Sequence, residues 1–273
     1  MTKSNNPSIK DLLLSHEEMN DKYQKLHETK YDYPYIYCIN SSTNSQTLCF
    51  LGTHHIYDPY HPQIGKIKKS WFKFLKKKID KNNCIVLTEG GIRPIESSEK
   101  DAILKHGEAG LMSFLSHKAC IRNISPEPDE KFEIKELEKQ FSKEQIEYYY
   151  FARTVLQWNK LKVKPEFNSY IRRYLDRDKL ITGWENFDFS VSNLISIHNK
   201  RHDHDFDPTE CERCVYKFSN PSQNPVASAS SHIRDEHIVN EIIKLWEAGK
   251  SIFIVYGSGH AIVCQKAIKY FLK

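Results

Sequence analysis

Two Gly-x-x-His turns are the parts of this sequence best suited to catalysis. One extends from Gly52 to His55 and the other from Gly257 to His260, and each directly follows a strand-sized run of apolar residues. Glycine lets the backbone bend sharply because it has no Cβ, and each turn then presents an imidazole at the start of the next element. Since an imidazole titrates at about pH 6.5, it can accept a proton from water near neutrality.

Glu89 places a carboxylate at a third position of the same kind. It directly follows the apolar run 84–88, where packing alone rarely places a charged side chain. Beside His55 and His260, this carboxylate would orient an imidazole for hydrolysis or act itself as the base that activates water. The same three side chains are also a normal ligand set for a catalytic divalent metal such as Mn, Co or Zn. The sequence leaves both interpretations open.

The elements around these residues predict an α/β fold, in which a mixed β-sheet is flanked by helices. The apolar runs predicted to be strands are 35–39, 47–51, 84–88, 120–124 and 252–256. Segments with helical spacing of apolar residues include 65–81, 99–117 and 231–248. The first two strands are predicted to form a hairpin. The later strands alternate with helices and form a parallel sheet, whose carboxyl ends share one edge, so we expect both histidine turns and Glu89 to meet there.

We expect residues 1–273 to form a single domain. The segment 130–198 is rich in helical patterns, with a capping box that begins at Ser142. It is predicted to be a helical subdomain that covers the site at the carboxyl edge of the sheet. The segment 199–230 is polar and contains three prolines, so it is predicted to be an inserted loop.

Composition and charge narrow the class of protein. The 273 residues are 39% hydrophobic and 27% charged, and the longest apolar runs are strand-sized, so neither a membrane span nor a signal peptide is predicted. A net charge of +5 does not by itself indicate nucleic-acid binding. The seven cysteines lie mostly in apolar segments, as Cys49, Cys84 and Cys264 do. They are interpreted as small buried side chains in a reducing compartment, which predicts a cytoplasmic location.

Four motifs follow one another along the chain: Phe50-Leu-Gly-Thr-His-His55, Leu87-Thr-Glu89, Arg234-Asp-Glu-His-Ile238 and Tyr256-Gly-Ser-Gly-His260. In this order they resemble the TraB/PrgY/GumN–Tiki–erythromycin esterase superfamily. The resemblance covers about residues 47 to 91 and 230 to 265, and the last motif is its most specific part. In the family that motif continues to a glycine three residues after the histidine, where this chain has Val263.

The resemblance implies a set of site residues. They are the paired imidazoles His55 and His260, the carboxylates Glu89 and Glu127, and the helix arginine Arg234. The helix that carries Arg234 is expected to begin at Ser231, which would place this cation in the first turn, against the helix dipole. Such a placement favours an arginine that reaches off the helix toward anionic groups in the cleft.

The functions known in this superfamily are diverse. Members have been assigned as divalent-metal proteases, as macrolide esterases, as a haem-binding lipoprotein and as pheromone-regulating membrane proteins. The resemblance therefore implies a hydrolase that cleaves an ester, lactone or peptide bond in a small molecule or a peptide. The alternatives are a non-catalytic protein that binds haem or a metal through the same histidine pair, and a regulatory domain that retains the fold. The substrate and the oligomeric state are left open.

A second group of residues has the spacing of zinc ligands. His202 and His204 are followed by Cys211 and Cys214, which form a Cys-x-x-Cys pair. Such a pair with nearby histidines is typical of a structural zinc site, and a bound zinc would hold the polar insertion together. The alternative interpretation is a solvated polar loop without metal.

Overall fold

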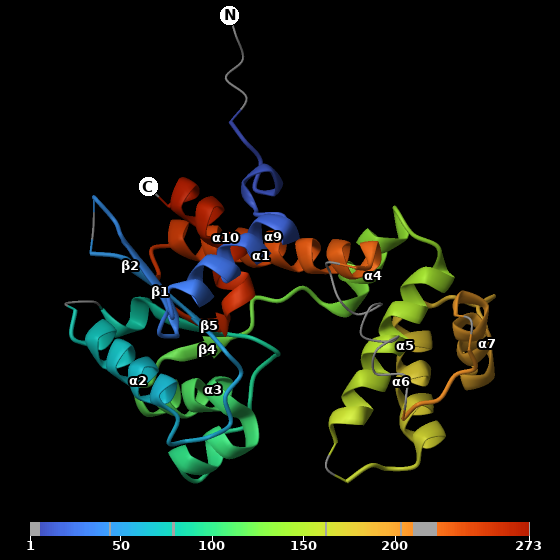
Figure 1. Cartoon of the computed structure of the whole chain (residues 1–273). Coiled ribbons are helices and arrows are strands. Elements are labelled where there is room, and N and C mark those ends of the chain that lie inside the picture. The colour runs from blue at the N-terminus through green and yellow to red at the C-terminus, as the bar shows by residue number, and fades with distance from the viewer. Residues whose placement is uncertain are drawn as a thin grey trace, which may run out of the picture. The chain divides into compact units, whose positions relative to one another are not determined.

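The computed structural model of the chain consists of two compact units (Figure 1). It describes residues 6–43, 45–77, 80–161, 163–202, 204–209 and 223–272. The sheet unit comprises Met1–Glu127 and Asp235–Lys273, and the helical unit comprises Pro128–Arg234. The chain therefore begins and ends in the sheet unit and enters the helical unit in between.

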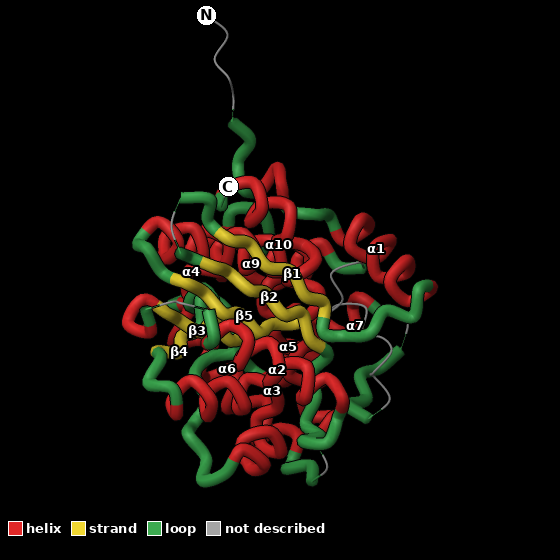
Figure 2. The backbone as a smooth tube through the Cα atoms, turned by 90° about the vertical axis from the view of Figure 1, so that its left-hand side faces the viewer, coloured by secondary structure: helices red, strands yellow, loops and turns green. Residues whose placement is uncertain are grey.

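A mixed β-sheet is the centre of the sheet unit, which confirms the predicted α/β class. Its strands in the described residues are β1 (Tyr35–Asn40), β2 (Thr47–Thr53), β3 (Cys84–Thr88), β4 (Arg122–Ile124) and β5 (Ser251–Gly257). They lie in the order β1-β2-β5-β3-β4 (Figure 2). β1 is antiparallel to β2, as the predicted hairpin requires, whereas β2, β5, β3 and β4 run parallel to one another. The carboxyl ends of these four strands therefore share one edge.

Helices cover both faces of this sheet. They are α1 (His16–Glu28), α2 (Pro62–Leu75), α3 (Glu99–Lys118), α10 (Ser258–Phe271) and the later part of α9 (Pro225–Glu247), with short 3-10 turns η1 (Lys10–Leu12) and η2 (Lys81–Asn83). Figure 2 shows α9 and α10 on one face of the sheet and α2 and α3 on the other. β2, β3 and β5 are buried along their whole length. Their alternate side chains fill two apolar cores, with Phe50 and Ile254 in one and Leu51 and Val255 in the other.

Helix α9 begins earlier than the sequence pattern indicates. It starts at Pro225, a residue favoured at the start of a helix because it lacks an N–H that would stay unpaired there. The side chain of Asn224 accepts a hydrogen bond from the Val226 N–H at 2.9 Å. The prediction that this helix begins at Ser231 is therefore wrong. Arg234 lies well inside the helix, so the helix dipole gives no reason for it to point off the helix end.

The helical unit contains the predicted helical segment 130–198. It is built from α4 (Glu130–Glu138), α5 (Lys143–Lys160), α6 (Phe167–Thr182), α7 (Val191–Arg201) and the first part of α9. α5 begins with the predicted capping box, in which Ser142 and Gln145 exchange hydrogen bonds of 3.3 and 2.9 Å. Phe151 and Leu175 belong to the apolar core between α5, α6 and α7.

The predicted loop 199–230 is too long at both ends. α7 continues to Arg201, and α9 already starts at Pro225. Between these helices, the residues that the structure describes form neither a helix nor a strand. None of the helices in the described ranges combines the length and apolar character needed to cross a bilayer.

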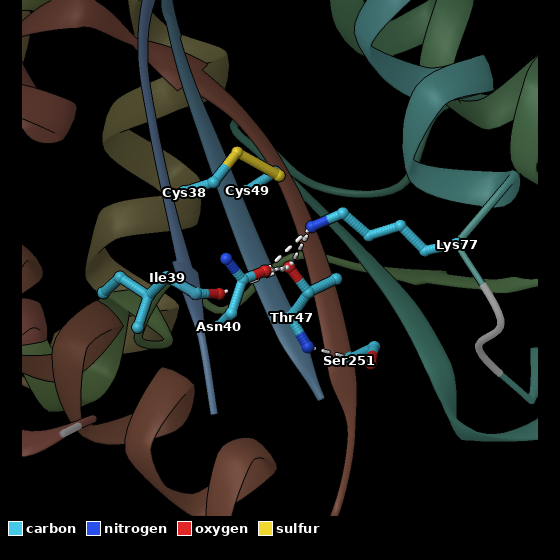
Figure 3. The surroundings of a disulfide bond; sticks show 7 residues. All are labelled: Cys38, Ile39, Asn40, Thr47, Cys49, Lys77 and Ser251. Carbon is cyan, nitrogen blue, oxygen red and sulfur yellow. Dashed lines mark hydrogen bonds between the residues drawn. A yellow bond between two sulfur atoms is a disulfide. The ribbon is translucent and has the colours of Figure 1, made fainter. Parts of the chain in front are cut away.

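A disulfide joins the two strands of the hairpin. The antiparallel register places Cys38 directly opposite Cys49, with their Cα atoms 4.2 Å apart (Figure 3). The interpretation of Cys49 as a free buried thiol is therefore wrong. The partner of a cysteine in a sheet is set by the register of the strands, which apolar neighbours in sequence do not reveal. Cys84 and Cys264 are free and buried, as predicted.

Candidate functional site

The carboxyl ends of three neighbouring strands bring the predicted site residues together. His55 follows β2, Glu89 follows β3, and His260 lies in the first turn of α10, directly after β5. The Nε2 atom of His55 lies 3.8 Å from Glu89 Oε2, and the Nε2 atom of His260 lies 3.7 Å from Glu89 Oε1. The two imidazoles therefore flank a single carboxylate.

A second carboxylate holds each imidazole from the other side. His55 Nδ1 lies 2.9 Å from Glu108 Oε1, and His260 Nδ1 lies 2.6 Å from Asp235 Oδ1. Glu108 and Asp235 are only 5% and 3% exposed. Because an ionised carboxylate only accepts hydrogen bonds, each Nδ1 donates its proton. In the neutral imidazoles the lone pair then resides on Nε2, on the side of Glu89.

The sequence pattern predicts neither Glu108 nor Asp235 as a site residue. Glu108 lies on α3 and also accepts hydrogen bonds from Thr53 Oγ1 at 2.9 Å and from the Ile56 N–H at 3.0 Å. The preceding Gly107 has a φ of 59°, and a Cβ there would lie 3.0 Å from the Ile56 carbonyl oxygen. A glycine beside a glutamate inside an otherwise helical pattern is the signal that indicates this close approach.

Gly257 fixes the position of Glu89. Its N–H donates a hydrogen bond of 2.6 Å to Glu89 Oε2. A Cβ on Gly257 would lie 3.0 Å from that oxygen and 3.5 Å from His55 Nε2. The φ of −54° at Gly257 is open to any residue, so the bend into α10 does not require the glycine that the sequence pattern predicted for it. The glycine is needed because the carboxylate and the imidazole lie where a Cβ would be.

A pocket opens on this group of residues. It has a volume of about 240 Å³, and its lining includes His55, Tyr57, Glu89, Arg93, His106 and Glu108. His55 is accessible, with 58% of its side chain exposed, whereas the side chain of His260 is 14% exposed. A substrate would therefore meet His55 and Glu89 first, with His260 deeper in the protein.

No family model, curated protein or solved structure matches this chain. The site therefore has to be interpreted from its own geometry. Within the described ranges, no group of three or more His, Cys, Asp or Glu side chains has the arrangement of a metal-ion site. The donor types of His55, Glu89 and His260 nevertheless suit a divalent metal, because carboxylates that hold the second nitrogen of ligating histidines are a usual feature of such sites.

The remaining histidine of the first turn and the other residues implied by the resemblance lie in different positions. The ring of His54, next to His55 in the chain, contacts Tyr33 with centroids 3.9 Å apart. Glu127 lies beside Glu89, since it accepts a hydrogen bond of 2.9 Å from the N–H of Gly90. Arg234 is partly buried on α9, and its role in the site stays a prediction.

The charges of His55 and Glu108 stabilise each other. The hydrogen bond to Glu108 raises the pKa of His55 above its ordinary value of 6.5, although burial acts in the opposite direction. Burial alone would raise the pKa of Glu108, but the hydrogen bond from His55 and other polar contacts hold it below 4.5. The contribution of protonated His55 to the free energy of unfolding is complete below pH 6.5 and is lost as the pH rises through the folded-state pKa of His55. The stabilisation from Glu108 is present above pH 4.5 and is lost as the pH falls through its folded pKa.

We expect Glu108→Gln to lower the pKa of His55, because an amide oxygen stabilises the imidazolium less than a carboxylate does. An NMR titration of the His55 Cε1–H signal measures this pKa in both proteins. Glu96→Gln is the matched control, since Glu96 contacts His106 at 3.1 Å rather than His55. An unchanged pKa of His55 in Glu108→Gln would contradict the assigned pair.

The predicted zinc ligands fall partly inside the described residues. His202 lies near the buried His198, with ring centroids 4.2 Å apart, and His204 is 5.4 Å from His202. Tyr148 contacts Nδ1 of His198 at 2.7 Å, and burial lowers the pKa of His198 to about 4. Its imidazole is therefore neutral at neutral pH. The predicted ligands Cys211 and Cys214 lie outside the described residues.

The zinc interpretation predicts that one equivalent of zinc remains with the protein when His55 and His260 are both replaced by alanine. The metal should be lost when Cys211 and Cys214 are both replaced by serine, because two thiolates supply half of a tetrahedral zinc site. Elemental analysis of the two purified double variants tests this expectation. Absence of zinc from the parent protein, with both thiols freely titratable in the native state, would make this segment a plain polar loop.

Proposed function

We propose that the sheet unit is a hydrolase that activates water to cleave an ester, lactone or peptide bond. The observation that carries this proposal is the symmetry of the site around Glu89. Two imidazoles have their Nδ1 atoms held by buried carboxylates and their Nε2 atoms within 4 Å of the same third carboxylate. A purely structural histidine needs one hydrogen-bond partner, whereas this arrangement prepares two proton-transfer groups on either side of Glu89. His55 lines the pocket, and His260 is the more buried of the two.

The two imidazoles suit opposite proton transfers. The raised pKa of His55 favours its protonated form, which can give a proton to the leaving oxygen or nitrogen. His260, whose Nδ1 donates to Asp235, can accept a proton from water at Nε2. The hydroxide then attacks the carbonyl carbon, and the C–O or C–N bond breaks as His55 protonates the leaving group. Transfer of the proton from His260 to His55 by way of Glu89 restores the starting state.

In a second version of the same proposal, a divalent metal assists the hydrolysis. His55, Glu89 and His260 would be its ligands, and the metal would supply Lewis-acid chemistry at the scissile carbonyl. The residues of this chain would still position the substrate and transfer protons to the leaving group. Activity that survives exhaustive chelation would favour the metal-free version, and activity restored by Mn, Co or Zn would favour the metal version.

The resemblance to the TraB/PrgY/GumN–Tiki–erythromycin esterase superfamily supports this function because it rests on the same two histidine turns and on Glu89. It also supplies the main alternative, a protein that binds haem through His55 and His260 without turnover. An assay on ester, lactone and peptide panels, with and without added metal, tests hydrolysis. A Soret shift on haem titration, combined with no turnover on any panel, would replace the proposed function by the alternative.

The predicted cytoplasmic location can be tested through the cysteines of the hairpin. The hairpin disulfide between Cys38 and Cys49 argues against it, because such bonds persist mainly in oxidising compartments. Alkylation of free thiols directly in cell lysate, followed by mass spectrometry, measures whether the bond is formed in the cell. Alkylation of both cysteines before any reductant is added would support a reducing compartment.

A further inference from the structure

Arg93 is a cation that lines the site pocket and has no partner among the residues that the structure describes. It lines the same pocket as His55 and Glu89, and in the described part of the chain no hydrogen bond or ion pair to its side chain is formed. Its Nε atom is fully buried without a hydrogen-bond acceptor. A buried donor without an acceptor costs free energy, and a guanidinium has five N–H groups to satisfy. Nε itself is closed to a ligand, so an anionic ligand in the pocket would bind the guanidinium through its Nη groups, for which the described residues supply no acceptor.

The turn after Glu89 fixes where this guanidinium lies. Gly90 has a φ of 76°, and a Cβ there would lie 2.5 Å from Arg93 Nη2. The Arg93 side chain thus lies directly over the bare backbone of the residue that follows Glu89. Only a glycine at position 90 both adopts this backbone conformation without strain and leaves room for the guanidinium.

The nearby acidic groups are engaged elsewhere. Glu96 is held by Lys105 at 2.6 Å and by His106 at 3.1 Å. Glu127 accepts from the Gly90 N–H, and Glu108 binds His55. Among the described residues that line the pocket, Glu89 and Glu108 repel an anion, whereas Arg93 and a protonated His55 attract it.

We propose that Arg93 binds a carboxylate group of the substrate, so that the hydrolysed bond lies close to a free carboxylate. This inference rests on the proposed function and names the substrate class of that site. The planar guanidinium matches a carboxylate through two parallel hydrogen bonds. The pocket volume of about 240 Å³ is below the usual range for ligand pockets, which suits a short acyl group and its carboxylate. A peptide bond at a free C-terminus and a lactone or ester of a small dicarboxylic acid are members of this class.

The first test measures binding without turnover. The Arg93 Nε–H signal is followed by NMR while acetate, succinate or N-acetylglycine is added, with the methyl ester of N-acetylglycine as the neutral control. We expect the signal to move with the carboxylates and not with the ester. Arg93→Lys should weaken N-acetylglycine binding about tenfold, because an ammonium lacks the two-donor fork. Arg122→Lys, at the exposed start of β4, should bind as the parent does. No response to any of the three carboxylates, or a stronger response to inorganic phosphate, would overturn the proposal.

The second test separates this proposal from the proposed function. Arg93→Lys should raise KM about tenfold more on substrates with a free carboxylate than on their methyl esters. A fall in kcat on both kinds of substrate would instead assign Arg93 to the developing oxyanion and overturn carboxylate recognition. If the parent protein binds N-acetylglycine through Arg93 but hydrolyses no substrate, the proposed function fails and the carboxylate site stands. Parental kinetics in both Arg93→Lys and Arg93→Ala would remove Arg93 from the site.

Discussion

His260→Asn should lower the rate of hydrolysis about 10³-fold while the fold is kept, as expected for loss of a general base. The amide nitrogen of asparagine can take the place of Nδ1 and keep the hydrogen bond to Asp235, but nothing replaces Nε2 opposite Glu89. Initial rates on the best substrate of the panels, together with thermal unfolding of the same samples, measure both effects.

His260→Ala is the companion variant that separates chemistry from stability. It loses the same base, so its rate should fall as far as that of His260→Asn. It also leaves Asp235, which is 3% exposed, with only the weak donor Cys264 Sγ at 3.4 Å, and loss of the main partner of a buried carboxylate costs about 2 kcal/mol. The melting temperature should therefore fall in His260→Ala and hold in His260→Asn. Near-parental activity per folded molecule in either variant would make His260 a structural residue.

Gly52→Ala should destabilise the protein by about 2 kcal/mol, because it overfills a tightly packed contact. A Cβ on Gly52 would lie 2.6 Å from the Ala261 Cβ and 2.9 Å from the Ser258 Cα. Both contacted residues belong to the first turn of α10, which carries His260. The added methyl group must push this turn away from β2, so the rate of hydrolysis should fall together with the melting temperature.

Gly65→Ala is the matched control for this prediction. Gly65 lies within α2, and no atom lies within 4 Å of the position that its Cβ would take. Alanine is the better helix former, so this variant should be stabilised by about 0.5–1 kcal/mol. Equal melting temperatures of the two glycine variants, measured in the same buffer, would show that the Gly52 contact relaxes without cost.

The sequence by itself determined the strands that carry the site and the turns that follow them. A fully buried parallel strand is a continuous apolar run, and a Gly-x-x-His sequence comes at the end of two such runs, so both signals are local in the chain. Tight contacts, rather than a sharp bend, are what require Gly52 and Gly257. The two local signals predict β2, β3 and β5 and place His55, Glu89 and His260 at one edge of the sheet. The α/β class follows from the same runs and the helical segments between them.

Tertiary structure decided which groups hold the two imidazoles. Glu108 and Asp235 lie 53 and 25 residues away from their histidines in sequence. On its own helix each is an ordinary charged residue, and only packing of α3 and α9 against the sheet buries it beside an imidazole. The disulfide is of the same kind, because the strand register, which sequence composition does not specify, joins Cys38 to Cys49. The chemical type of each site residue and its place at a strand end can thus be predicted from the local sequence. The pKa values and hydrogen-bond partners of these residues depend on contacts between segments that are distant along the chain.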